Sequence, residues 1–276
     1  MGDTYAQALG GGMQTSKYKT KRLNVERNRL TCKGAAAILG GLNEEIQELN
    51  IGNNPRIGLD AYRLLSNSIK SKFQRLAYLN IEGNNAGDSA IDMICLAAGG
   101  CNNLHTINMS RNCITDTGAE GIAYLIRQTQ SVRAFYMAWN RVRETGGAEI
   151  GLALEYNTSL VVFDAGFNSF GARAVKQGSN SFRIAHSEAA DALRSAFKEN
   201  NKLLHVDLSH NQFTEIDCQV MAGGLVINHT LIGLHMLGNE CDTDTMGFLR
   251  AKPSPPSSLH IMSRISRKLF MPRYHV

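Results

Sequence analysis

The stretch LNIEGNNA, residues 79–86, decides the fold because its pattern returns along the whole chain. The pattern has apolar residues at positions 1, 3 and 8 and asparagine at position 6. Eight copies begin at Leu23, Leu49, Leu79, Ile107, Phe135, Phe163, Val206 and Leu234. Successive starts are 26, 30, 28, 28, 28, 43 and 28 residues apart. A repeat at so constant a period predicts a solenoid of stacked units.

Between the motifs, the spacing of apolar residues changes from two to about 3.6. In the fifth unit Ile150, Leu152 and Leu154 follow a glycine pair, and in the sixth Leu193 and Phe197 follow an alanine pair. We expect these residues to face one side of a helix of about 10–12 residues. Each unit is therefore predicted to be strand, turn, helix and turn, with neighbouring units sharing one core.

The motif and its period resemble the leucine-rich repeat family, in particular the ribonuclease-inhibitor-like class, whose units are about 28 residues long. The resemblance covers residues 23–249. It implies an α/β horseshoe of about eight repeats, with a concave parallel β-sheet and convex α-helices. It also implies an asparagine ladder that satisfies backbone groups where the chain leaves the sheet. The expected ladder is Asn28, Asn54, Asn84, Asn112, Asn140, Asn168, Asn211 and Asn239.

Composition divides the chain into three parts. Residues 1–22 are a basic segment that we interpret as a partial repeat or a cap, and residues 23–249 are the repeat domain. A polar and basic insertion at about 170–188 lengthens one interval, and it is either a second recognition element or a tolerated loop. Residues 250–276 combine a Pro/Ser linker with a basic amphipathic tail, which either caps the solenoid or tethers it. The tail residues of interest are Arg264, Arg267 and Lys268.

The formal net charge of +5 is distributed unevenly. Residues 250–276 contain six Lys or Arg and no acid, and residues 1–30 have a net charge of +4, which leaves −5 on the body between them. No basic face interleaved with aromatic residues is present, so we expect no nucleic-acid binding. Membrane contact is expected only through the basic tail, because no apolar run is long enough to span a bilayer.

The six cysteines have no CxxC spacing and no nearby histidine pair. We therefore expect neither a zinc site nor a disulfide framework. A reducing compartment, the cytoplasm, is the default expectation for such a chain.

Alternation along each strand is expected to place positions 2, 4 and 5 on the concave side and positions 1, 3, 6 and 8 in the core. The only tryptophan, Trp139, would then be exposed beside Tyr136 and Phe167. An exposed aromatic cluster usually marks a partner site. The alternative is that the tail or the inserted loop covers these rings. The predicted partner-binding residues are Tyr136, Trp139, Phe167, Arg111, Asp164, Asp207, His210 and His235.

The later copies also gather acids and histidines, including Asp207 and His205. Such groups can bind a divalent ion or relay a proton. The pattern indicates no nucleophile, pocket or glycine-rich phosphate loop beside them. We therefore predict solvated surface groups, with no catalytic residue, no metal and no cofactor.

These observations favour a non-enzymatic scaffold or assembly subunit that binds protein partners, and no small-molecule substrate, through its concave face. The repeats are similar to those of cytosolic, cytoskeletal and ciliary assembly proteins, which implies a multi-subunit intracellular complex of that kind. The alternative is a regulator of a small GTPase, because the Ran GTPase-activating protein has similar repeats. Such regulators usually have an acidic C-terminal segment, whereas this tail is basic.

Overall fold

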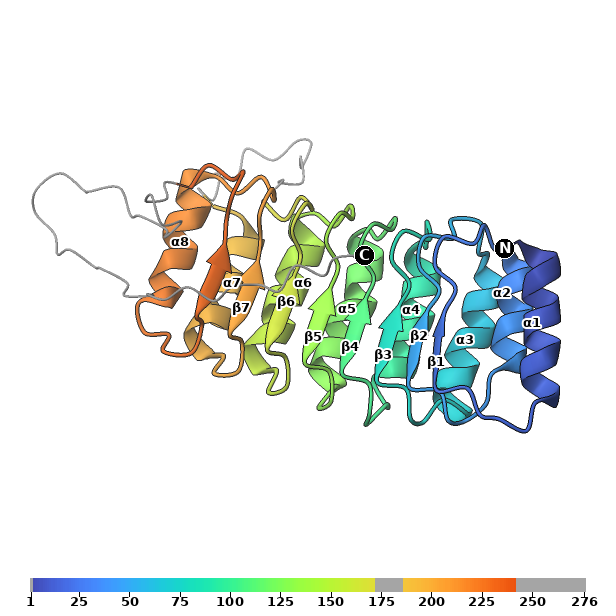
Figure 1. The fold of residues 1–276 in the computed structure, drawn as a ribbon. Helices are drawn as coiled ribbons and strands as arrows, with labels where there is room; N and C mark the ends of the chain where they lie inside the picture. Colours follow the sequence, from blue (N-terminus) through green and yellow to red (C-terminus); the bar gives the residue numbers. More distant parts are fainter. Residues whose placement is uncertain (1, 172–185, 242–276) are drawn as a thin grey trace, which may run out of the picture.

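The computed structural model of the protein describes residues 2–171 and 186–241. Within these ranges one sheet contains eight parallel strands in chain order, and every strand pairs only with its neighbours along the chain (Figure 1). The strands are β1 (Arg22–Asn24), β2 (Glu48–Asn50), β3 (Tyr78–Asn80), β4 (Thr106–Asn108), β5 (Ala134–Tyr136), β6 (Val162–Asp164), β7 (His205–Asp207) and β8 (Gly233–His235). The helices are α1 (Asp3–Thr15), α2 (Cys32–Gly41), α3 (Leu59–Ser71), α4 (Asp88–Ala98), α5 (Asp116–Gln128), α6 (Glu144–Tyr156), α7 (Glu188–Glu199) and α8 (Glu215–Leu225).

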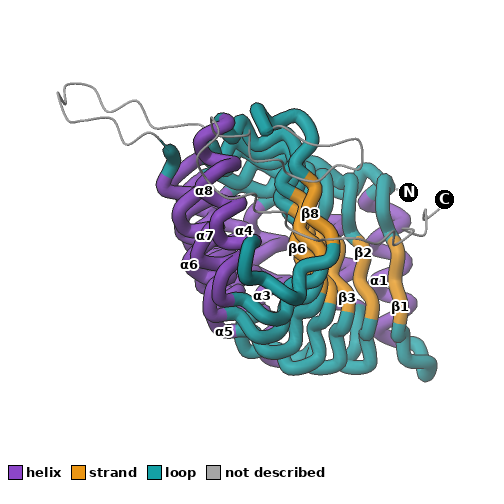
Figure 2. Tube along the Cα trace, turned by 90° about the vertical axis from the view of Figure 1, so that its left-hand side faces the viewer, coloured by secondary structure: helices purple, strands orange, loops and turns teal. Residues whose placement is uncertain are grey.

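The sheet and the helices form two layers joined by turns above and below, as the view along the solenoid shows (Figure 2). This arrangement confirms the expected α/β solenoid of about eight repeats. All seven strand pairs have the same register, so that Leu23 lies beside Leu49 and Leu49 beside Leu79. Equal motif positions therefore form continuous rows across the sheet, and each row has one side chain per repeat.

A single apolar core extends from α1 to the last repeat and is built from positions 1, 3 and 8 together with one face of each helix. The largest buried side chains include Phe135 and Phe163 on adjacent strands. One helix expectation is wrong: Ile150 and Leu154 are buried, but Leu152 is 43% exposed. Two residues correspond to about 200° around a helix, so Leu152 points to the convex surface rather than to the core.

Helix α1 stacks on α2 as the later helices stack on one another. A side chain at Gly10 would collide with the backbone of Ala37, so glycine permits a very close approach of these two helices. The carboxylate of Asp3 accepts the backbone N–H of Thr31 at 2.9 Å, and Asp88 forms the corresponding bond at a later repeat. Residues 3–15 thus occupy the position of a repeat helix ahead of the first strand.

The motif asparagines lie where the chain leaves the sheet. The Oδ1 atom of Asn112 accepts the backbone N–H groups of Asn84 and Ala86, at 3.1 and 2.9 Å. Its Nδ2 atom donates to three carbonyl groups at 2.9–3.1 Å. Asn54 and Asn211 form similar sets of bonds in other repeats. Each such carboxamide joins two turns and satisfies backbone groups that packing has removed from water.

Position 5 has left-handed backbone geometry in every repeat. The residues there, with φ between +55° and +75°, are Arg27, Asn53, Gly83, Arg111, Trp139, Phe167, His210 and Gly238. Each strand has only three residues, from the residue before position 1 to position 2, and the chain then turns sharply. Strict alternation therefore ends before positions 4 and 5.

The expectation that position 4 faces the concave solvent is wrong for most repeats. Position 4 is buried at Gly52, Ser110, Ala138, Gly166 and Ser209. The left-handed residue that follows turns the chain, and position 4 packs against the next repeat in a space that suits small side chains. Position 5, in contrast, projects from the rim of the sheet where the strands end.

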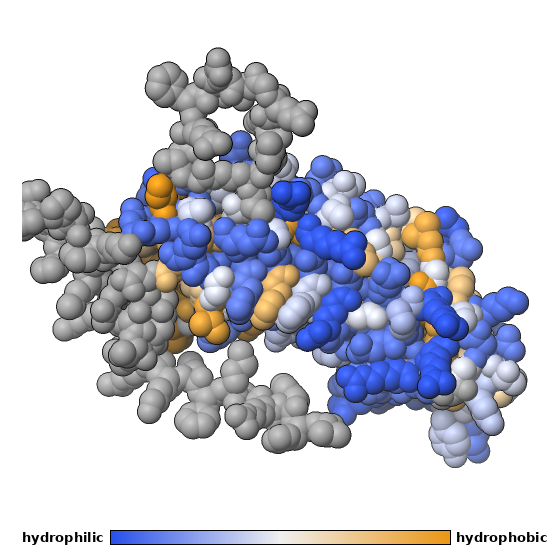
Figure 3. Space-filling view, turned by 90° about the horizontal axis from the view of Figure 1, so that it is seen from above, coloured by the Kyte–Doolittle hydropathy of each residue, from blue (hydrophilic) through white to orange (hydrophobic). Residues whose placement is uncertain are grey.

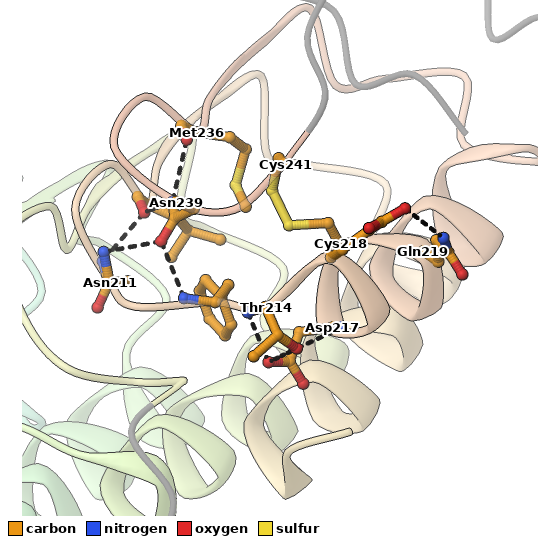
Figure 4. The surroundings of a disulfide bond; sticks show 11 residues. Asn211, Thr214, Asp217, Cys218, Gln219, Met236, Asn239 and Cys241 are labelled. Carbon is orange, nitrogen blue, oxygen red and sulfur yellow. Dashed lines mark hydrogen bonds between the residues drawn. A yellow bond between two sulfur atoms is a disulfide. The ribbon is translucent and has the colours of Figure 1, made fainter. Parts of the chain in front are cut away.

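A disulfide joins Cys218 of α8 to Cys241, with a Cα–Cα distance of 5.7 Å (Figure 4). The expectation of no disulfide is wrong at this pair. The two cysteines are 23 residues apart, and the repeat brings them together because Cys241 occupies the inward-facing position 8 of the last copy. The pairing also removes the cysteine argument for a reducing compartment. The other four cysteines are free.

Two expectations concern residues outside the described part of the chain: the centre of the insertion, 172–185, and the tail with Arg264, Arg267 and Lys268. None of the helices in the described ranges has the length and apolar content that crossing a membrane requires.

Candidate partner-binding surface

Position 2 of the repeats has a structural role in six of its eight copies. There the Oδ1 atom accepts the backbone N–H two residues further on, at 2.8–3.0 Å, in an Asx turn. The residues concerned are Asn24, Asn50, Asn80, Asn108, Asp164 and Asp207. Tyr136 and His235 replace this side chain with a ring that lacks a carboxyl or amide oxygen. These two positions depart from what the turn favours.

Position 5 builds a stacked row of four side chains across successive repeats: Arg111, Trp139, Phe167 and His210. The Trp139 and Phe167 rings are 3.9 Å apart with an interplanar angle of 9°, and the Phe167 and His210 rings are 4.2 Å apart. The Arg111 guanidinium lies 4.9 Å from the Trp139 ring centroid. Strand spacing of about 4.8 Å brings equal positions to stacking distance. Trp139 is 47% exposed, so the row is open to a partner.

Both ends of the stacked row are fixed by neighbouring residues. At one end, Arg111 Nε pairs with Glu82 Oε1 at 3.3 Å, and Glu82 also accepts a hydrogen bond from Asn108. At the other end, His210 lies directly over Gly238, where an added Cβ would collide with the imidazole ring. Gly238 has a φ of +75°, which glycine adopts without strain. The rings are thus held in place before any partner arrives.

Acids and histidines lie next to the row, on the concave face of the last three strands. The strand register places Asp164 beside Asp207 and Asp207 beside His235. Burial raises the pKa of Asp164 to about 6, and the neighbouring Asp207 carboxylate contributes in the same direction. His205 lies 4.6 Å from the His235 ring, and its pKa is lowered by burial and by that second imidazole. Across the described ranges no cluster of three or more His, Cys, Asp or Glu suits a metal ion.

The predicted site residues occupy two rows rather than one patch. Trp139 and Phe167 stack at the rim, whereas Tyr136 lies within the sheet beside Asp164. Apart from His205, sequence reasoning missed a third row, the residue before position 1, which points to the same side as position 2. Its partly exposed members Ala134 and Val162 are adjacent apolar residues between Thr106 and His205. Starting each strand one residue earlier would have revealed this row.

The face seen from above in Figure 3 is mostly hydrophilic where it is not covered by grey atoms, and its hydrophobic residues are scattered. The visible part of this face therefore presents polar groups more than one large apolar patch. We use "binding surface" below for the stacked row together with Tyr136, Asp164, Asp207 and His235.

Comparison with known proteins gives one family match. A family model described as Leucine Rich repeat matches residues 100–123 and 199–220. No match was found among curated protein sequences.

Three solved structures show low similarity to the chain. The leiomodin-1 actin-binding site 2 has 14% identity and a TM-score of 0.44, covering 64% of this chain and 91% of that one. The tropomodulin C-terminal domain of Caenorhabditis elegans has 18% identity and a TM-score of 0.46, covering 59% and 90% respectively. An internalin of Listeria monocytogenes has 14% identity and a TM-score of 0.40, covering 84% and 64%.

Proposed function

Because the chain is a leucine-rich repeat protein, we propose that it is a scaffold or assembly subunit that binds a protein partner through the binding surface. The observation that supports this proposal is the stacked row, an ordered and partly exposed set of one arginine and three rings across repeats four to seven. Protein-binding sites are enriched in tryptophan, tyrosine and arginine. The ribonuclease-inhibitor-like subclass stays a prediction.

The fold itself does not require rings at position 5. The same left-handed turn is formed by Arg27, Asn53 and Gly83 in the first three repeats. Replacing such residues by Trp139 and Phe167 leaves large apolar groups at the surface, which contribute little to a core they do not enter. A polar side chain is the usual residue at such an exposed position. Binding to another molecule explains why the chain has aromatic rings there instead.

Pre-organisation strengthens the proposal. Each ring in the stacked row is confined by its neighbours, so a partner that binds there orders few side chains. Ordering a free side chain at an interface costs about 0.5–1.5 kcal/mol. Aromatic groups held in one geometry give contact area at low entropic cost.

The test compares two double variants of the full chain. Trp139→Ala with Phe167→Ala is expected to abolish capture of the main protein partner from extracts of cells that express the protein. Arg27→Ala with Asn53→Ala changes the same motif position in repeats one and two, and is expected to leave capture intact. Tm should fall by less than about 3 °C in both, because neither pair is buried. If the Trp139/Phe167 variant captures the partner as well as the Arg27/Asn53 variant does, the proposal that the partner binds at this surface is refuted.

The proposed setting is a multi-subunit complex of the cytoplasm, cytoskeletal or ciliary. This part rests on the resemblance of the repeats to those of such assembly proteins. Imaging of the tagged full-length chain is expected to show co-localisation with cytoskeletal filaments or cilia. A pool confined to the secretory pathway or the nucleus would contradict it.

A further inference from the structure

We infer that the binding surface recognises a basic, extended segment of its protein partner, with an arginine side chain placed against the carboxylates of Asp164 and Asp207. This inference rests on the proposed function and specifies the chemistry of the partner. Its first support is the balance of charge on the concave face and rim.

Three arginines on the concave face and rim of the described repeats are already paired with acids of the chain. The pairs are Arg22 with Glu48 at 3.1 Å, Arg27 with Glu26 at 3.3 Å, and Arg111 with Glu82 at 3.3 Å. Asp164 and Asp207, by contrast, form no ion pair with any residue of the described ranges. Apart from the neighbouring imidazoles of His205 and His235, these two carboxylates have no cationic partner among the described residues, and a cation from outside complements them.

The two carboxylates lie close together, on either side of Gly166. A Cβ built on Gly166 would stand 3.3 Å from Asp207 Oδ1 and 3.5 Å from Asp164 Oδ1. Each Oδ1 accepts an Asx-turn hydrogen bond, and neither Oδ2 accepts one from a described residue. Two ionised carboxylates on either side of one glycine repel each other, and a bound cation relieves the repulsion. A guanidinium has several donors in a planar fork, so it can serve both free oxygens.

The stacked row complements the backbone of such a segment. The faces of Trp139 and Phe167 are covered by their neighbours, so their edges face a partner. Ring edges have partial positive charge and attract carbonyl oxygens. The indole N–H of Trp139 adds a donor that no described residue accepts. Phe167 directly follows Gly166, so the carbonyl-binding edge and the two carboxylates adjoin. One extended peptide can contact both.

The test uses the full-length chain and an array of 12-residue peptides, each made with arginine, glutamine or glutamate at the central position. We expect the best arginine peptides to bind at least about tenfold more tightly than their glutamine versions. Asp164→Asn with Asp207→Asn should reduce that preference to less than about twofold. Asparagine retains the oxygen that the Asx turn needs, and a Tm that does not fall below that of the unaltered chain verifies the fold.

A matched control removes the same charge elsewhere. Asp60→Asn with Glu120→Gln alters two exposed acids on the convex helices, and the arginine preference should persist there. Absence of an arginine preference in the unaltered chain, or its persistence in the Asp164/Asp207 variant, would overturn the inference. If the cellular partner is nevertheless lost on Trp139→Ala with Phe167→Ala, the proposed function stands and only the basic-partner inference fails.

The basic tail of the same chain is the competing occupant. Arg264→Gln, Arg267→Gln and Lys268→Gln together remove three of its cations while keeping the chain at full length. If the surface binds a partner, peptide affinity in this variant should equal that of the unaltered chain within about twofold. If arginine peptides bind only after the tail is neutralised, the surface belongs to the tail and the inference is wrong.

Discussion

The first four repeats and the last four share one backbone and expose different chemistry. In repeats one to four, position 2 is always asparagine, and the charged side chains of the concave face pair among themselves. In repeats five to eight, the same rows contain rings, histidines and carboxylates that form no ion pair with a described residue. Each motif position occurs eight times in the same backbone. Comparing the copies therefore separates the side chains that the fold requires from those that it does not require.

Position 2 illustrates the separation most clearly. Asn80 and Asp164 make the same Asx-turn bond, yet only the aspartate brings a negative charge to the face. A neutral amide suffices for the turn, so the charge is additional to the fold. The same reasoning applies to position 5, where Gly83 and Phe167 have the same left-handed backbone.

The largest expected effect on stability comes from the asparagine ladder, which both halves of the solenoid share. Asn54→Ala and Asn211→Ala each remove a buried carboxamide that bonds backbone groups of two repeats. Both should lower the free energy of unfolding by about 4 kcal/mol, because several buried backbone groups lose their partners. Urea unfolding followed by circular dichroism measures this. A cost below about 1 kcal/mol in one half would show that the scaffold is not uniform.

The next effect is confined to the C-terminal end. Reduction of the disulfide, or Cys218→Ser with Cys241→Ser, releases a constraint that spans 23 residues. Closure of such a loop contributes about 3 kcal/mol. Hydrogen exchange should quicken in α8 and β8 and remain unchanged in β1 to β4. Uniform loss of protection along the whole solenoid would contradict a local role.

A smaller effect is expected when Asp164, at position 2 of repeat six, is replaced by the asparagine that repeats one to four have at this position. The pKa of Asp164 is raised from 3.8 to about 6, so protonation of this carboxyl stabilises the folded state relative to the unfolded state. That contribution is complete below pH 4 and is lost as the pH rises through about 6. Asp164→Asn should therefore raise the unfolding free energy by about 1–2 kcal/mol at pH 7.5 and leave it unchanged at pH 4.

The groups facing this carboxyl are Tyr136 on β5, Asp207 on β7 and His235 on β8. Chemical denaturation of both forms at the two pH values decides the prediction. A gain at pH 4 that equals or exceeds the gain at pH 7.5 would contradict burial and the Asp207 charge as the causes.

The smallest effect compares two glycines at the same motif position. Gly83→Ala and Gly238→Ala each place a Cβ on a residue with positive φ, which costs about 1 kcal/mol of stability. Only the second displaces His210 from the end of the stacked row. We expect similar unfolding curves for the two variants and weaker partner binding for Gly238→Ala alone. Equal binding would mean that His210 does not support the row.

The period, the solenoid and its strand–helix units could be predicted from sequence because an eightfold pattern averages out local ambiguity. Three details could not. Position 4 is buried because the strand ends after position 2, a boundary that periodicity does not locate. The Asx-turn bond of Asp164 depends on backbone direction, and the disulfide depends on which position faces α8.

The placement of the rings shows a further limit of sequence reasoning. The repeat motif suggests exposure of Trp139 and Phe167 at position 5, but their stacking follows from a left-handed backbone that no single motif reveals. Tyr136 adjoins them in sequence and lies in a separate row. Side-chain rows are therefore set by register, which becomes known only when the strands are paired.

Site-specific photo-crosslinking tests the central claim most directly, that partners contact the last repeats and not the first. A photoreactive phenylalanine analogue replaces Tyr136 in one full-length chain and Asn50, the same motif position in repeat two, in another. Illumination in cells is expected to give a covalent protein adduct from residue 136 and none from residue 50. An adduct from residue 50, or no adduct from residue 136, would contradict the claim.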